Sequence, residues 1–258
     1  MSDLWTAVLA LAILLFLVFA IKQWVMRRLQ GLGLLALGTA ERAIWLRFLI
    51  LAPGIFLHEF SHWLTAKILG VTTGKFSLGP SEFKRRGNRV QVTMGYVMVG
   101  RSDPFRASMI GAAPFFFGTI AIILLASYGF HQSLGPWVPP QTRLTQIVTG
   151  LPDLFAVADV WLWVYLVFSV SNSMIPSESD RRGWLEVAIY VGILAAIVFF
   201  LVGIPRIPDD TILWAQRGLD YLLFAFALTL IVDVVMGVVI WLLLLIVSFF
   251  THRRIDFG

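Results

Sequence analysis

The sequence predicts an all-α polytopic membrane protein with about six transmembrane helices and a small membrane-associated β-segment after the second helix. Hydrophobic residues make up 59% of the 258-residue chain and charged residues only 14%. A soluble domain is usually about 45–50% apolar. Lysine and arginine fall mainly between the apolar runs, a pattern that indicates contact with anionic membrane lipid. No basic helix interleaved with aromatic residues occurs, so nucleic-acid binding is not expected.

The first two apolar runs are predicted to span the bilayer. Residues 4–21 lack a basic start and a small-residue cleavage site, so we interpret them as a retained span rather than a signal peptide. Residues 30–39 are glycine-rich and too short to cross a bilayer, which needs about 20 residues, so they should lie along the surface or re-enter it. The second span covers residues 44–69 and contains Pro53, where the helix is expected to kink.

Residues 71–106 form the longest stretch without a spanning pattern. Residues 75–78 and 89–94 are predicted as short strands around a polar turn at 84–88, and residues 95–99 can continue the sheet. Val90, Val92 and Met94 alternate with polar residues, as expected for a strand on an apolar face.

Four more spans are predicted after this connection. They cover residues 107–130, 151–175, 184–203 and 221–250, with a loop at 204–220. The last is longer than a bilayer requires, so it is tilted or projects from the membrane. The chain then divides into residues 1–43, the first helix and its connecting segment; residues 44–182, a core with both polar motifs; and residues 183–258, two C-terminal helices.

The core contains an H-E-x-x-H motif at residues 58–62, inside the second span. On a helix, His58 and His62 stand on one face with Cβ atoms about 5–6 Å apart, which lets both rings bind one zinc ion. Glu59 is then placed to take a proton from the attacking water as general base. Such polar groups are costly in a membrane span and indicate function. Because the chain has no cysteine, any further metal ligand must be a histidine or a carboxylate.

Catalytic zinc usually has three protein ligands, and the motif supplies two of them. The acidic candidates in or near the later spans are Asp153, Asp159, Asp180, Glu186 and Asp233. Asp180 differs from the others because Asn172 precedes it by eight residues, with Pro176 between them. Asp233 is its main rival, since it lies in an apolar run. For Asp233 and Asp159 the alternative interpretation is a helix-to-helix hydrogen bond.

These two motifs, in this order, resemble those of the site-2 protease family of intramembrane zinc metalloproteases. We expect a minimal form of that family, without a PDZ or CBS domain. The family pairs H-E-x-x-H on one span with N-x-x-P-x-x-x-L-D-G on a later one. This chain keeps the spacing from Asn172 to Asp180, but its proline comes one position late, and Ser179 and Arg181 replace the leucine and the glycine. The resemblance implies that Asp180 is the third zinc ligand and that Asn172 and Pro176 lie near the substrate path.

Two looser matches extend the resemblance over roughly residues 44–182. Residues 94–97 are similar to a G-G-Y-V segment in the family's β-region, and residues 111–114 are similar to its A-G-P segment. The resemblance implies a zinc metalloendopeptidase in a prokaryotic cytoplasmic membrane. Its substrate would be a single-pass membrane protein, such as an anti-sigma-like regulator already trimmed by another protease.

The sequence also suggests an orientation and a mode of substrate binding. The basic connection at residues 71–106 places the active site toward the cytosol by the positive-inside rule, and six crossings would place both termini there as well. The substrate is expected to add as a strand beside Val90, Val92 and Met94, with Asn172 bonding its backbone from the other side. Open alternatives are a zinc protease that cuts peptides at the membrane surface, a zinc-binding membrane transporter and a catalytically inactive scaffold.

Overall fold

Five helices of the computed structural model are long and apolar enough to cross a membrane. The structure describes residues 2–86, 89–129, 159–202 and 208–253. The five helices are α1 (Ser2–Leu37), α2 (Ala40–Ile68), α3 (Pro104–Gly129), α7 (Trp184–Val202) and α8 (Asp209–Thr251). A shorter apolar helix, α6 (Val160–Ser173), and two strands, β1 (Thr73–Arg86) and β2 (Arg89–Val99), accompany them. This architecture fits the predicted class of helical membrane protein with a small sheet after the second helix.

The first helix is longer than predicted. α1 continues without a break to Leu37, so the prediction of a separate surface segment at residues 30–39 is wrong. The cause is packing: a Cβ on Gly33 would lie 2.9 Å from the Cβ of Ala43, so glycine allows α1 and α2 to approach closely. This contact offsets the low helix propensity of glycine. α1 ends before Gly38, which has a φ of +76°, and Thr39 caps the start of α2.

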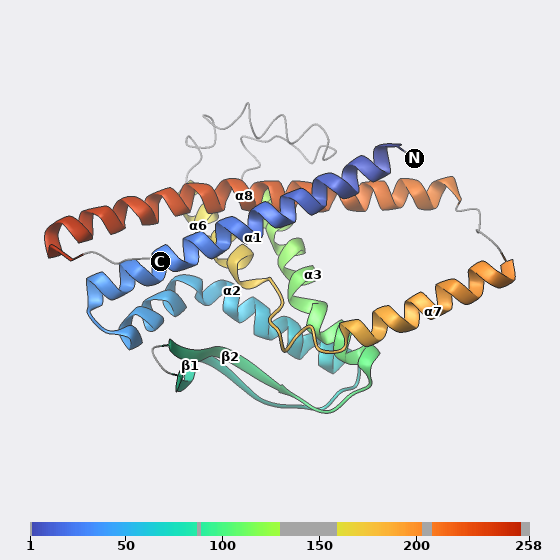
Figure 1. Ribbon diagram of the computed structural model, residues 1–258, viewed down its shortest axis with the longest axis horizontal. Coiled ribbons are helices and arrows are strands. Elements are labelled where there is room, and N and C mark those ends of the chain that lie inside the picture. Colours follow the sequence, from blue (N-terminus) through green and yellow to red (C-terminus); the bar gives the residue numbers. More distant parts are fainter. Residues whose placement is uncertain (1, 87–88, 130–158, 203–207, 254–258) are drawn as a thin grey trace.

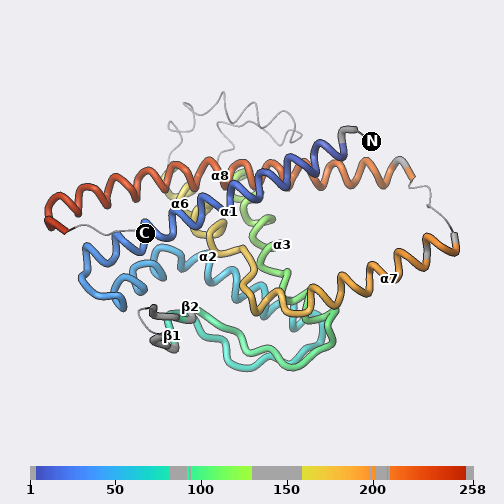
Figure 2. Tube along the Cα trace, viewed as in Figure 1, coloured from blue at the N-terminus to red at the C-terminus, as the bar shows by residue number. Residues whose placement is uncertain are grey.

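α1 and α8 lie side by side and run in the same direction (Figure 1; Figure 2). Gly237 of α8 makes room for α1, since a Cβ there would lie 2.7 Å from the Trp24 ring and 3.0 Å from Val25. Two parallel helices that both cross a membrane leave the start of the first and the end of the second on opposite sides. The expectation of six crossings with both termini on one side does not fit this arrangement.

The last helix also begins earlier than predicted. α8 begins at Asp209, so the predicted loop is wrong for residues 209–220. Pro208 precedes the helix, and Asp210 lies in its first turn, where negative charge is favourable. With 43 residues, α8 is longer than a bilayer requires, as predicted.

The predicted fourth span is described only as α6, which has 14 residues; residues 151–158 lie outside the described part of the chain. α6 is a core helix that packs against α2, α3 and α8. Val167 and Phe168 are fully buried within it. Gly54 on α2 allows the closest approach, because a Cβ there would lie 2.0 Å from the Ser169 carbonyl oxygen. α6 therefore ends directly beside the histidine-bearing half of α2.

β1 and β2 form an antiparallel two-stranded sheet that lies along α2 (Figure 1). Its register pairs Phe76 with Val97 and Leu78 with Gly95. β1 is longer than the predicted strand at residues 75–78, and shifts in register at Ser81 mark local irregularities. Residues 84–86 of the predicted turn belong to β1, so the turn is shorter than predicted, and residues 87–88 lie outside the described residues. The sheet brings the middle of β2 against the H-E-x-x-H segment.

Candidate metal centre

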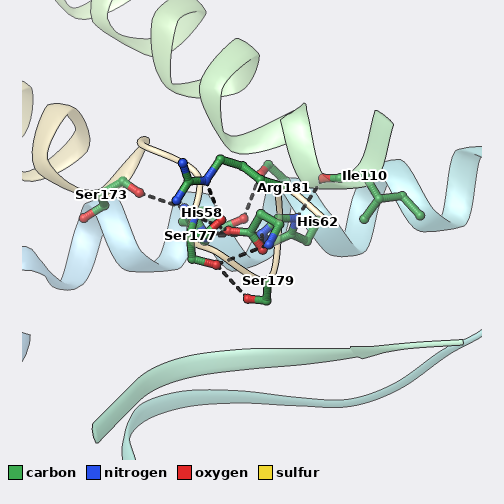
Figure 3. A network of polar contacts seen from close by, with 9 residues as sticks. His58, His62, Ile110, Ser173, Ser177, Ser179 and Arg181 are labelled. Atoms are coloured by element: carbon green, nitrogen blue, oxygen red, sulfur yellow. Dashed lines mark hydrogen bonds and ion pairs between the residues drawn. The ribbon is translucent and has the colours of Figure 1, made fainter. Parts of the chain in front are cut away.

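His58 and His62 stand one turn apart on α2, with their Nε2 atoms 3.1 Å apart. The other nitrogen of each ring faces a backbone carbonyl (Figure 3). Nδ1 of His58 lies 2.7 Å from the Ser173 carbonyl oxygen at the end of α6, and Nδ1 of His62 lies 2.8 Å from the Ile110 carbonyl oxygen on α3. Because a carbonyl oxygen only accepts, both Nδ1 atoms carry the hydrogen and both Nε2 atoms present a lone pair.

Asp180, on the turn between α6 and α7, completes the cluster. Its Oδ2 lies 3.6 Å from Nε2 of His58, and its Oδ1 lies 3.4 Å from Nε2 of His62. One ligand atom from each of the three residues lies within 4.8 Å of the others. Atoms bound at about 2.0–2.1 Å to one tetrahedral zinc ion lie about 3.3–3.4 Å apart. The three predicted ligands are therefore spaced to hold a metal ion of this size.

The electrostatics of the cluster favour a cation. Two imidazole lone pairs and a carboxylate converge on one space, so each acceptor repels the others until a positive charge lies between them. The carbonyls of Ser173 and Ile110, on two different helices, accept the Nδ1 hydrogens and fix the rings in this orientation, as is usual for metal-binding histidines. The donor set therefore fits a metal site better than a purely structural hydrogen-bond network.

A short turn holds Asp180 in place. The Ser177 amide donates to Oδ2 of Asp180 at 2.7 Å, the Asp180 amide donates to Ser177 Oγ at 3.4 Å, and Arg181 Nε donates to the Ser177 carbonyl at 3.3 Å. Burial alone would raise the pKa of the Asp180 carboxyl, but its contacts with Ser177 act against burial, and that pKa lies below its usual range. Asp180 is therefore a carboxylate at neutral pH, the form that binds metal.

Gly111 on α3 allows this turn to reach the histidines. A Cβ on Gly111 would lie 1.8 Å from the Asp180 carbonyl oxygen, so any side chain there would displace the turn. Gly111 belongs to the segment at residues 111–114 that the sequence marked as similar to a family motif. Its role in the structure is close packing of the ligand-bearing turn on α3.

Glu59 lies in the same cavity as the three ligands and is 8% exposed. The cavity has a volume of about 1320 Å³, and one of its walls is formed by residues 94–99 of β2. The turn at residues 177–180 forms another part of the lining. A buried carboxylate, a metal-ligand cluster and a strand thus share one large cavity.

The predicted substrate-binding residues do not all lie at the cavity. Met94 lines the cavity, whereas Val92 and Pro176 are half-buried outside its lining. The Val90 side chain lies outside the described residues. Asn172 is 5% exposed and lies on α6, where its Nδ2 donates to the Asp233 carboxylate and to the Phe168 carbonyl. Among the described side chains predicted to bind substrate, only Met94 reaches the cavity.

The two rival acids lie away from the cluster. Asp233 accepts hydrogen bonds from Ser171 and Asn172, which confirms the predicted helix-to-helix hydrogen bond. Asp159 is exposed at the start of α6 with a φ of 61°, and its side chain forms no cap hydrogen bond. Within the described residues, the helix-to-helix interpretation does not hold for Asp159.

Sequence reasoning missed the groups that orient the ligands. The carbonyls of Ser173 and Ile110 carry no side-chain signature, and Ser177 lies in a polar stretch where nothing singles it out. The only available signals were the polar run at residues 171–173 after an apolar segment and the small residues at 111–113. No protein-family model matches the chain, and no curated protein and no solved structure matches it. The assignment of a function therefore depends on the geometry of the site.

Proposed function

We propose that the chain is an intramembrane zinc metalloprotease similar to the site-2 proteases. The observation that carries the proposal is the convergence of His58, His62 and Asp180 on one point, in a helical bundle with membrane-spanning character. The two Nε2 atoms and the Asp180 carboxylate would bind the zinc ion. When bound, zinc would polarise the scissile carbonyl and acidify the attacking water.

Glu59 supports an enzyme over a binding protein. Three other residues already supply a ligand set, so a carboxylate next to His58 is not needed to hold the metal. Glu59 lines the same cavity and is suited to accept the proton of the attacking water and to pass it to the leaving amine. A zinc transporter or an inactive scaffold would have no use for a base at this position.

The cavity and the sheet support a peptide substrate. A volume of about 1320 Å³ exceeds the roughly 300–1,000 Å³ typical of small-molecule pockets. A membrane helix hides its carbonyls in its own hydrogen bonds, so it must unwind before attack. β1 pairs with one edge of β2, and no other described strand pairs with the second edge. An unwound segment would bond to this free edge, which offers the hydrogen bonds that an apolar environment lacks.

The proposed substrate is a single-pass membrane protein, such as an anti-sigma-like regulator, cut in or near its span. The proposed location is a prokaryotic cytoplasmic membrane with the active site toward the cytosol, which the basic residues between α2 and α3 support. The volume of the cavity also suits peptides at the membrane surface, which makes a surface-peptide protease the second candidate.

Metal removal and return test the proposal. The purified chain in detergent should contain about one zinc ion per molecule and should cut a synthetic single-span peptide into fragments that mass spectrometry can assign. A chelator should abolish the cleavage, and zinc should restore it. His58→Ala is the matched variant that should neither retain zinc nor recover activity. Full cleavage by a metal-free sample would contradict the proposal.

A further inference from the structure

We propose that Asp233, on the C-terminal helix α8, is a positioning residue for the metal centre and acts through the last turn of α6. The proposal deepens the proposed function and rests on it, because it concerns how His58 is held for metal binding. Asp233 is 1% exposed and lies in the middle of α8. The reaction scheme above gives this buried carboxylate no role, which a membrane bundle seldom tolerates without a reason.

Asp233 joins α8 to the end of α6. Its Oδ1 accepts a hydrogen bond from Asn172 Nδ2 at 2.8 Å. Oδ1 also lies 3.2 Å from Ser171 Oγ and shares that hydroxyl hydrogen with the Phe168 carbonyl oxygen at 3.0 Å. The next residue, Ser173, is the last of α6, and its carbonyl receives the Nδ1 hydrogen of His58 at 2.7 Å. Two consecutive side chains held by Asp233 thus lie directly before the carbonyl that orients a metal ligand.

The other side of α6 is fixed to α2, the helix that carries His58. The Gly54 amide donates to Ser169 Oγ at 2.9 Å, and the backbones touch because Gly54 has no side chain. α6 is therefore held at Ser169 by α2 and at residues 171–172 by α8. Loss of the α8 contact would free the end of α6 that carries the Ser173 carbonyl, while the contact at Ser169 would remain.

Asp233 also sets the orientation of the Asn172 amide. The two hydrogens of Nδ2 go to Asp233 Oδ1 and to the Phe168 carbonyl oxygen at 2.9 Å. Since a carboxylate only accepts, it turns the NH2 group of Asn172 toward α8. The buried amide oxygen of Asn172 is then left without a hydrogen-bond partner among the described residues. This oxygen is the atom of Asn172 that remains able to accept a hydrogen bond.

The positioning role depends on an acceptor at residue 233 rather than on its charge. Lys22 of α1 interacts electrostatically with Asp233, so a variant that removes the carboxylate also removes the partner of a cation. Asp233→Asn separates the two effects, because an amide oxygen still accepts from Asn172 while the charge is gone. Asp233→Ala removes both the acceptor and the charge.

The test compares zinc affinity in the full-length chain in detergent. Zinc dissociation constants are measured by competition with a chelator, and the visible spectrum of the cobalt-loaded protein reports the ligand geometry. Asp233→Ala should bind zinc about 10–100-fold more weakly and shift the cobalt spectrum, as changes behind a metal-binding histidine usually do. Asp233→Asn should stay within about threefold of wild type, a change smaller than the lower end of that range. Thr229→Val is the matched control, since Thr229 is a fully buried polar residue one turn earlier on α8.

Several outcomes would overturn the proposal. If Asp233→Ala has a lower melting temperature but unchanged zinc affinity and cobalt spectrum, the hydrogen bonds of Asp233 stabilise the fold and do not position the metal ligand. Rescue of Asp233→Ala by Lys22→Gln would show that the unpaired cation caused the defect. If Asp233→Ala does not fold, Asn172→Ala, which breaks the same link from the α6 side, decides instead: weakened zinc affinity with a shifted cobalt spectrum supports the proposal, and wild-type affinity contradicts it. Absence of zinc from wild type itself would overturn both this proposal and the proposed function.

Discussion

Gly95 of β2 lies directly against Glu59 of α2: a Cβ on Gly95 would be 3.1 Å from Cγ and 3.2 Å from Oε1 of Glu59. The strand backbone thus forms the wall on which the proposed base rests. The contact links the sheet to the chemistry, because residues 94–99 of the same strand line the cavity. A side chain at position 95 would have to share the space that the Glu59 carboxylate occupies.

Gly95→Val should therefore impair catalysis without emptying the metal site. The added side chain would displace the Glu59 carboxylate, and a misplacement of about 1 Å can cost about a hundredfold in rate. Cleavage rate and zinc content are measured together. Gly74→Val is the control, because a Cβ there would meet Met98 at a similar 3.1 Å but away from Glu59. Gly95→Val activity within about twofold of wild type, instead of that hundredfold loss, would show that the contact does not position the base.

The ligand set makes a separate prediction. Asp180→Ala should lose zinc as well as activity, since two histidines alone hold zinc weakly. Asp233→Asn and Asp159→Asn should keep the metal, because neither carboxylate lies in the cluster. Metal analysis of the purified variants distinguishes the cases. A zinc-free Asp233→Asn alongside a zinc-loaded Asp180→Ala would refute the assignment.

The free edge of β2 makes a prediction about substrate. Val92→Pro should remove a backbone donor and distort the strand, so cleavage of a helical membrane peptide should fall strongly while zinc stays bound. Val92→Ala is the control, since it keeps the backbone donor. Substrate titrations against both variants provide the measurement. Unchanged cleavage by correctly folded Val92→Pro would exclude strand addition at this segment.

Orientation in the membrane can be tested because the chain has no cysteine of its own. A cysteine introduced at Asn88, between the two strands, should be protected from an impermeant thiol reagent in intact cells, as a cytosolic connection would be. Permeabilised cells provide the positive control. Labelling of that cysteine from outside would reverse the proposed orientation.

The sequence predicted the parts of the site that local spacing determines. His58 and His62 fall on one helix face because of the helical period. Asp180 was predicted as the third ligand because its spacing from Asn172 resembles that of the family motif. The Ser173 and Ile110 carbonyls could not be foreseen, because they meet the rings across 115 and 48 residues of chain. Such contacts depend on how α6 and α3 pack, which no local pattern specifies.

The errors in the fold have a similar origin. Glycines before Leu37 suggested a break in α1, but Gly33 instead serves close packing on Ala43. Asp209 and Asp210 suggested a loop, although acidic residues after a proline are also a helix-start signal. In both places the local sequence was compatible with either a helix or a break. Packing between α1 and α2 decided the first case, and the position of the helix start decided the second.

The substitution Glu59→Gln tests the central claim most directly. It keeps the size of the side chain and removes the base, while His58, His62 and Asp180 stay in place. The variant should bind as much zinc as wild type, and its cleavage of a single-span membrane peptide should fall by about 10²–10⁴-fold or more. Zinc-loaded Glu59→Gln that cleaves within about tenfold of wild type, a loss smaller than the least expected on removal of a general base, would contradict the account.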